Sequence, residues 1–204
     1  MITVGILALQ GDFLEHEAVL SRLGVNAIQV RKSENLHDLD GFIVPGGEST
    51  TVCRLMQEYQ LYKPLRRVLS SGLPTWGTCA GMIVLAQHVD SLEYPTLETL
   101  DITVERNGYG RQVNSFESDI PIPILGELPF HAIFIRAPVV RKVGADVEIL
   151  ATLSTTNGGG GSPVALRQGN LLATTFHPEL TEDSRLHRYF LGMVESAERR
   201  SNPR

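Results

Sequence analysis

Cysteine is scarce in this sequence, which has only Cys53 and Cys79 among 204 residues. Two cysteines are too few for a disulfide framework, and reduced thiols in a reducing compartment fit them better. No basic segment followed by an apolar one comes after Met1, so we expect no secretory leader. No apolar run approaches the roughly 20 residues that a membrane-spanning helix requires. We therefore expect a cytoplasmic protein without a membrane segment.

Positive charge is also scarce, because the sequence has 18 Lys and Arg but 23 Asp and Glu, which gives a net charge of −5 at pH 7. Binding to nucleic acid phosphates requires a basic face, so nucleic acid is not expected as the main partner. The chain has no phosphate-binding nucleotide loop and no cluster of metal ligands, so we expect neither a metal nor a cofactor. A hydrophobic content of 42% is ordinary for one globular domain.

The first 44 residues alternate between strand and helix patterns. Residues 2–9 are almost wholly apolar, which is typical of a strand buried on both faces. An amphipathic helix is predicted for residues 13–23, and strands are predicted for residues 25–30 and 42–44. This order favours a doubly wound, mostly parallel sheet flanked by helices, with ligands at the carboxyl ends of its strands. The inward face of the helix is expected to comprise Leu14, Ala18, Val19 and Leu20.

The second half of the chain carries closely spaced strand patterns, which predict an antiparallel portion appended to the parallel sheet. A run of glycines at 158–161 is expected to form a hairpin tip. A terminal helix is predicted from Leu180 to Glu198, with Thr181 as its cap. We expect a single domain over residues 1–196 and a polar C-terminal tail over residues 197–204. The later strands are expected within residues 100–105, 113–116, 130–138, 147–153, 164–167 and 171–176.

The segment around Cys79 combines a short apolar stretch, the pattern Gly77-Thr78-Cys79-Ala80-Gly81 and a buried helix beginning at Met82. This is the thiol version of the strand–nucleophile–helix elbow, and its two glycines suit a turn too tight for side chains. The N-terminus of the helix would favour the thiolate. The alternative is a small buried cysteine in an ordinary turn. Cys53 lies among apolar helix residues and is interpreted as a core residue.

Two further segments follow predicted strands. Pro45-Gly46-Gly47 could supply backbone donors to an oxyanion, or could be an ordinary turn, and Ser49 or Thr50 could cap the next helix.

His177-Pro178-Glu179 ends the last strand, and in extended backbone the imidazole and the carboxylate would share one side. The alternative there is a chance turn with a solvated Glu179. A nucleophile, oxyanion donors, a base and a residue to orient the base together suit acyl transfer through a thioester.

These residues resemble the class I (triad) glutamine amidotransferases. Within that class the sequence is similar to the glutaminase subunits of pyridoxal phosphate synthase over nearly the whole chain. The Cys79 elbow alone would indicate only the superfamily. The strings that carry the narrower resemblance are Leu9-Gln10-Gly11, Pro45-Gly46-Gly47-Glu48-Ser49-Thr50-Thr51, Val104-Glu105-Arg106-Asn107, Gly110-Arg111-Gln112-Val113, Phe134-Ile135-Arg136-Ala137-Pro138 and Phe176-His177-Pro178-Glu179-Leu180-Thr181.

The resemblance implies a mechanism in which Cys79 attacks the side-chain amide of glutamine. His177 would protonate the departing ammonia and then activate water, while Glu179 fixes the imidazole. Backbone N–H groups of Gly47 and Ala80 would form the oxyanion hole. The residues implied in glutamine binding are Gly47, Glu48, Ser49, Arg106, Ile135 and Arg136.

The two arginines also make physical sense on their own, because the α-carboxylate of glutamine needs a cation or strong donors. Their alternative is surface arginine at a strand end. The resemblance further implies a partner, the synthase subunit that accepts the ammonia in a hetero-oligomeric complex. Gln10 and the Pro45 loop are expected at that interface, and activity is expected to rise when the partner docks.

Three other functions stay open at this point. The chain could serve a different synthase, such as the one for imidazole glycerol phosphate. It could be a cysteine hydrolase or peptidase of the same fold. It could also be a binding subunit that has lost catalysis, although the intact Cys79, His177 and Glu179 argue against this.

Overall fold

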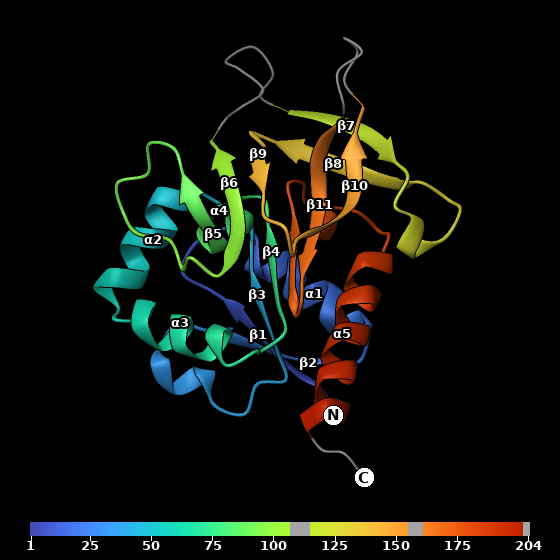
Figure 1. Cartoon of the computed structure of the whole chain (residues 1–204). Coiled ribbons are helices and arrows are strands. Elements are labelled where there is room, and N and C mark those ends of the chain that lie inside the picture. Colours follow the sequence, from blue (N-terminus) through green and yellow to red (C-terminus); the bar gives the residue numbers. More distant parts are fainter. Residues whose placement is uncertain (107–114, 155–160, 202–204) are drawn as a thin grey trace.

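A seven-stranded sheet forms the centre of the molecule in a computed structural model that describes residues 1–106, 115–154 and 161–201 (Figure 1). Five neighbouring strands, from β12 to β2, run parallel, and β10 and β11 extend the sheet antiparallel at one edge. The predicted fold class, a mostly parallel α/β sheet with an antiparallel addition, is confirmed. In spatial order the strands are β10 (Glu148–Leu153), β11 (Ser162–Gln168), β12 (Leu171–Thr174), β4 (Thr75–Thr78), β3 (Gly41–Val44), β1 (Thr3–Leu7) and β2 (Asn26–Val30).

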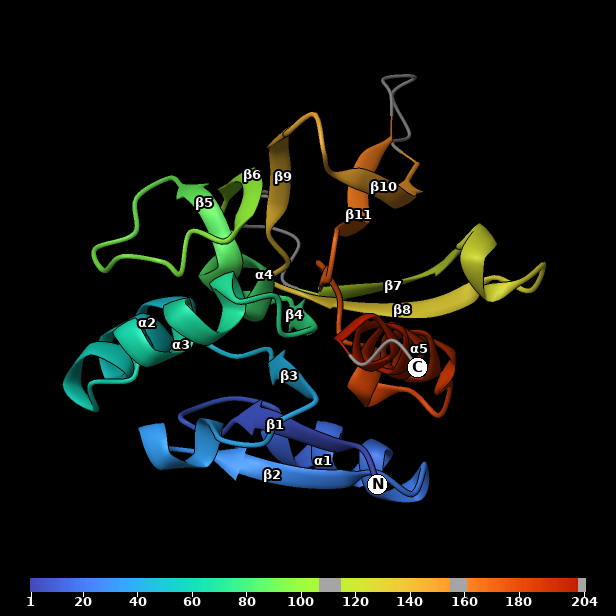
Figure 2. The same cartoon turned by 60° about the horizontal axis from the view of Figure 1, so that its bottom comes forward.

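Helices cover both faces of this sheet, as Figure 2 shows for α2 and α3 on one side and α5 on the other. Side chains of successive strand residues point to opposite faces of the sheet. Val4 and Ile6 of β1 pack in the core with α1 and α5, whereas Leu7 packs in the core with α2 to α4. Among the described residues, no helix has the length and apolarity to cross a membrane. The helices are α1 (Phe13–Arg22), α2 (Ser49–Glu58), α3 (Tyr62–Ser70), α4 (Ala80–Leu85) and α5 (Arg185–Ser201), with 3-10 turns η1 (Ser33–Leu36), η2 (Pro123–Leu125) and η3 (Pro178–Leu180).

The inward face predicted for α1 is wrong in part. Val19 and Leu20 are buried, but Leu14 is 57% exposed and Ala18 is exposed as well, while His16 is fully buried. His16 was not among the residues expected to face inward. Its imidazole points inward because its polar partners lie inside the fold, as described below.

Two small sheets lie beside the central one. Strands β5 (Ala86–Val89), β6 (Leu100–Glu105) and β9 (Val139–Val143) form the first, and β7 (Ser115–Ile120) pairs with β8 (Phe130–Ile135) in the second. Neither β5 nor β9 was predicted. The helix expected from Met82 ends early, at Leu85, because the chain turns directly into β5.

The C-terminal helix also differs from the prediction at both ends. It begins at Arg185, where the Asp183 carboxylate accepts a hydrogen bond from the Arg185 N–H (3.0 Å), and it continues to Ser201 into the expected tail. Thr181 instead donates to the Pro178 carbonyl (3.1 Å). Most of the expected hairpin tip at 157–161, the segment 107–112 and the first two residues of the strand expected at 113–116 lie outside the described residues.

Candidate active site

The nucleophile candidate Cys79 lies in a strained turn between β4 and α4. Its backbone has φ 47° and ψ −105°, a conformation that L-residues rarely adopt and that often marks a functional site. The turn is too tight for other side chains, since a Cβ at Gly81 would overlap the Val44 carbonyl and one at Gly77 would lie 2.6 Å from the Gly81 carbonyl carbon. The prediction of a tight turn is confirmed, although the positive φ belongs to Cys79 itself.

The two thiols have different surroundings. Cys53 is fully buried in the core against α3 and α4, as predicted, and burial raises the pKa of its thiol to about 12. Cys79 is 5% exposed and lines a cleft, where its Sγ lies 3.6 Å from the Ile135 carbonyl oxygen. Only Cys79 of this pair can meet a substrate.

The sheet topology brings the base candidate to the same edge as Cys79. Strands β4 and β12 are parallel neighbours, so Cys79 and His177 follow them on the same side. Backbone hydrogen bonds fix both positions: the Cys79 N–H donates to the Thr174 carbonyl (2.8 Å), and the His177 N–H donates to the Ile133 carbonyl (2.9 Å).

His177 and Glu179 form a buried pair. His177 Nδ1 lies 2.8 Å from Glu179 Oε1, and the two residues are 3% and 5% exposed. Glu179 is therefore not the solvated side chain of the alternative interpretation. The local geometry differs from the prediction, because Glu179 lies in the 3-10 turn η3 and not in an extended segment. Burial raises the pKa of Glu179, while the hydrogen bond with His177 opposes that shift.

A second carboxylate, Asp12, was missed at the sequence level. Its Oδ2 lies 3.2 Å from His177 Nδ1, and its N–H donates to the Gly46 carbonyl (3.0 Å). Burial alone would lower the pKa of His177, but hydrogen bonds with Asp12, Cys79 and Glu179 outweigh it and hold the pKa well above its ordinary value. The imidazolium form of His177 is thereby favoured next to the Cys79 sulfur.

The loop after β3 packs too closely for side chains larger than glycine. A Cβ at Gly46 would lie 2.7 Å from His177 Nδ1, and one at Gly47 would lie 2.5 Å from Gln10 Oε1. The Glu48 N–H donates to the same Gln10 oxygen (2.7 Å). Pro45-Gly46-Gly47 is thus fitted against the His177 ring and against Gln10, and is more than an ordinary turn.

Glu48 is the N-cap of α2, so the predicted cap at Ser49 or Thr50 is wrong. Its carboxylate accepts from the N–H groups of Thr50 (3.0 Å) and Thr51 (2.7 Å), which a longer side chain can reach from the position before the helix. Burial works against ionisation here, but these hydrogen bonds lower the pKa of Glu48. The carboxylate also pairs with Arg106 Nη2 at 3.0 Å.

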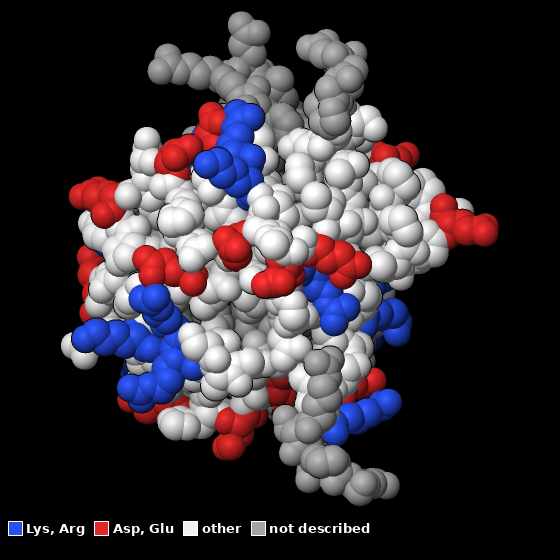
Figure 3. Space-filling view, in the orientation of Figure 1, with Lys and Arg blue, Asp and Glu red and all other residues white. Residues whose placement is uncertain are grey.

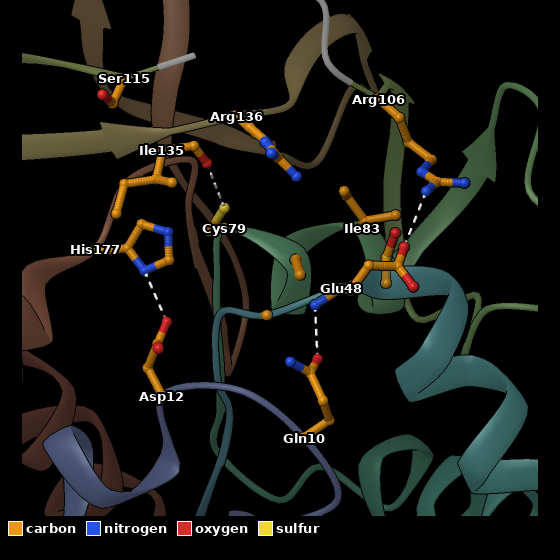
Figure 4. Close-up of a pocket in the computed structure, with 13 residues that line it drawn as sticks. Gln10, Asp12, Glu48, Cys79, Ile83, Arg106, Ser115, Ile135, Arg136 and His177 are labelled. Carbon is orange, nitrogen blue, oxygen red and sulfur yellow. Dashed lines mark hydrogen bonds and ion pairs between the residues drawn. The ribbon is translucent and has the colours of Figure 1, made fainter.

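All of these groups surround one cleft of about 600 Å³ (Figure 4). Every predicted site residue lines it except Glu179, which contacts the lining residue His177. In Figure 4 Arg136 points into the cleft beside Cys79, while Arg106 reaches Glu48. The cleft is lined by both carboxylates and guanidinium groups, and this combination suits a zwitterionic amino acid. The lining residues that were not predicted as site residues are Gln10, Asp12, Ile83 and Ser115.

Within the described residues, Asp12, His177 and Glu179 form one group whose donor atoms lie within 4.8 Å of one another. Both carboxylates approach the same nitrogen, His177 Nδ1, so a metal ion would have to displace the 2.8 Å hydrogen bond to Glu179. The arrangement suits an imidazolium held by two carboxylates better than a metal ion.

A cysteine on a strained elbow, next to a buried His–Glu pair at the edge of a doubly wound sheet, is typical of the cysteine-dependent amidotransferases. The chain belongs to the SNO glutamine amidotransferase family, whose model matches residues 6–196. The predicted resemblance is confirmed.

Two curated relatives carry the name pyridoxal 5'-phosphate synthase subunit PdxT. The protein from Herpetosiphon aurantiacus is 52% identical, over 94% of this chain and 100% of its own length. The protein from Pelotomaculum thermopropionicum is also 52% identical, over 92% of this chain and 93% of its own. A crystal structure of a glutamine amidotransferase superposes with a TM-score of 0.86 at 51% identity, covering 94% and 98% of the two chains. A putative GMP synthase subunit from Thermoplasma acidophilum shares the fold, with a TM-score of 0.67 at 19% identity over 98% of each chain.

Proposed function

We propose that this chain is the glutaminase subunit of a pyridoxal phosphate synthase. It hydrolyses L-glutamine to L-glutamate and ammonia and delivers the ammonia to the synthase subunit. The observation that carries the proposal is the strained Cys79 in a cleft with His177, which Glu179 holds at 2.8 Å. The relatives that are 52% identical favour this synthase over the one for imidazole glycerol phosphate. Family membership favours glutamine over a peptide as substrate.

The reaction begins when the Cys79 thiolate attacks the side-chain carbonyl carbon of glutamine. The carbonyl oxygen becomes an oxyanion, for which the N–H groups of Gly47 and Ala80 are the proposed donors. Ala80 is the first residue of α4, where N–H groups have no acceptor within the helix. The His177 imidazolium then gives its proton to the leaving ammonia, and a thioester with Cys79 remains.

Water cleaves the thioester in the second half of the reaction. Neutral His177 removes a proton from the water as it attacks, and the imidazolium and the Cys79 thiolate are restored when glutamate leaves. Glu179 keeps the ring oriented throughout.

Glutamine is proposed to bind through Gly47, Glu48, Ser49, Arg106, Ile135 and Arg136. Arg136 is the better candidate for the α-carboxylate, because it points into the cleft, whereas Arg106 is held by Glu48 at 3.0 Å. Glu48 offers a negative charge for the α-amino group.

Ammonia needs an acceptor, and we place it on the synthase subunit in a hetero-oligomeric complex. Gln10 accepts from the Glu48 N–H (2.7 Å), so a partner that contacts Gln10 would act on the oxyanion loop through one hydrogen bond. We therefore expect low hydrolysis by the chain alone and higher hydrolysis with the synthase subunit. Equal ammonia release in both conditions would contradict this. A cytoplasmic location is part of the proposal, supported by the free thiols of Cys53 and Cys79.

Replacement of Cys79 by Ala tests the nucleophile. Loss of the sulfur should lower glutamine hydrolysis on the order of 10⁴-fold or more, as removal of a triad nucleophile does, while co-purification with the synthase subunit persists. The matched control is Cys53→Ala, which removes the other thiol and should retain hydrolysis. Hydrolysis by Cys79→Ala near the parent rate would exclude the proposed mechanism.

A further inference from the structure

One oxygen of the buried Glu179 carboxylate lacks an ordinary hydrogen bond. Oε1 meets His177, but Oε2 accepts no hydrogen bond of standard geometry from the part of the chain that the structure describes. A buried carboxylate without donors is costly, and such an atom calls for an explanation. An N–H candidate is at hand, since His16 Nε2 lies 3.4 Å from Oε2.

His16 is fully buried on α1, behind the catalytic pair as seen from the cleft. Its Nε2 also lies 3.2 Å from Thr78 Oγ1, and its Nδ1 lies 3.1 Å from His187 Nε2 of α5. Trp76 packs edge-on against both imidazoles, with ring centroids 5.7 Å and 4.9 Å away. His16 does not line the cleft, so an effect of His16 on the substrate would have to pass through Glu179.

Burial favours the neutral form of both imidazoles. Burial, with contributions from His187 and His177, places the pKa of His16 well below its ordinary value. Burial and the nearby Arg22 lower the pKa of His187 to about 3. Each ring therefore carries one N–H, and its neighbours decide which nitrogen holds it.

The Glu179 carboxylate determines which ring nitrogens of His16 and His187 carry protons. An ionised Glu179 can only accept, so the proton of His16 belongs on Nε2, where Thr78 Oγ1 shares it. His16 Nδ1 then accepts from His187 Nε2–H. This leaves a lone pair on His187 Nδ1, the atom that has no partner among the described residues. The opposite tautomer would leave a buried N–H there, which is the rarer and costlier case.

We propose that His16 is a positioning residue that directs its Nε2–H to Glu179 Oε2, and that His187 fixes the tautomer of His16. The inference rests on the proposed function, in which Glu179 orients the base His177. Every hydrogen in the series His187–His16–Glu179–His177 then points toward the one carboxylate. Glu179 stays an ionised acceptor inside the protein because it has a donor on each oxygen.

The tautomers can be measured on the full-length chain without any turnover. Nitrogen-15 NMR of the histidine rings should show His16 and His187 neutral at about pH 7, each with its proton on Nε2. His16→Gln and His187→Gln provide the assignments among the six histidines. A proton on His16 Nδ1, or a charged His16, would overturn the inference, whereas a chain that fails to hydrolyse glutamine would refute only the proposed function.

The second test compares His16→Phe with His16→Gln in complex with the synthase subunit. Phe removes the donor, and loss of one charged hydrogen bond should lower kcat roughly tenfold with little change in KM. The acid limb of the pH profile should move up by about one unit, because Glu179 without its donor takes a proton more readily. Both variants keep Arg22 and Asp12, the other ionisable groups near the buried histidines. Gln offers an amide N–H and should restore most of kcat and of the profile.

A control that changes only packing distinguishes loss of the hydrogen-bond donor from a general loss of stability. Leu20→Ala lowers stability from the same helix, because Leu20 is fully buried, and it removes no polar group. It should leave the acid limb in place. Equal limb positions for Phe, Gln and Leu20→Ala, measured together with thermal midpoints, would show that His16 only fills space.

Discussion

Asp12 is the carboxylate that sequence reasoning missed, and its removal gives the most direct test of the electrostatics around His177. The change Asp12→Asn keeps the shape of the side chain. It also keeps the backbone hydrogen bond from Asp12 N–H to Gly46, so the oxyanion loop stays anchored. Only the negative charge 3.2 Å from His177 Nδ1 is lost.

The magnitude follows from the distance and the exposure. Two unit charges 3.2 Å apart interact with about 5 kcal/mol at an effective dielectric constant of 20 and with about 1.3 kcal/mol in water. The Asp12 side chain is 34% exposed, so solvent screening moves the value toward the lower figure. About 1.4 kcal/mol corresponds to one pKa unit, and the pKa of His177 should fall by about that much in the variant.

The assay is the pH dependence of kcat for glutamine hydrolysis with the synthase subunit present. In the proposed mechanism the His177 imidazolium protonates the leaving ammonia, so its deprotonation should set the alkaline limb. Carboxylates raise the pKa of His177, and removal of one carboxylate should shift this limb about one unit lower. Glu15→Gln removes the same charge from the exposed face of α1 and serves as the control. An alkaline limb that stays in place in Asp12→Asn, or that moves equally in Glu15→Gln, would refute the reasoning.

Two further predictions concern the oxyanion loop and the acid stability. In Gly46→Ala the new Cβ would lie 2.7 Å from His177 Nδ1 and displace the ring, so kcat should fall by about a hundredfold. The control Gly192→Ala has open space around the new Cβ and should leave kcat unchanged. A Gly46→Ala enzyme that keeps the parent kcat would contradict this packing argument. Because His16 and His187 stay neutral when folded but protonate when unfolded, the free energy of unfolding from urea titrations should fall by up to about 2.7 kcal/mol per pH unit between about pH 6.5 and 5. Stability that is flat across this window would show that both rings are charged inside the fold.

The sequence was most informative where chemistry and turn geometry are local. Cys79 between two glycines, and His177 two positions before Glu179, are recognisable without a structure. The alternation of apolar strands and helices predicted the parallel sheet for the same reason, because strand burial shows in the residues themselves.

Contacts between distant elements could not be predicted in this way. Asp12 follows the carboxyl end of β1, where sheet rules place ligands, but nothing local says that it faces His177. Glu48 was passed over as a helix cap because shorter side chains dominate that position. His16 was not predicted to be buried, and its partners come from the distant elements β4, η3 and α5.

The surface in Figure 3 shows why charge alone gives little guidance to such a site: acidic and basic side chains are mixed over this face. The informative charges are inside. The two imidazoles beside Trp76 and the Glu179 carboxylate are costly to bury, and apolar side chains of similar volume would pack there with a smaller desolvation penalty. The cost is explained if Glu179 must remain ionised away from solvent, because it then needs donors that solvent cannot supply. Acid would protonate the same imidazoles in the unfolded chain, so the residues proposed to keep His177 oriented are also expected to limit stability at low pH.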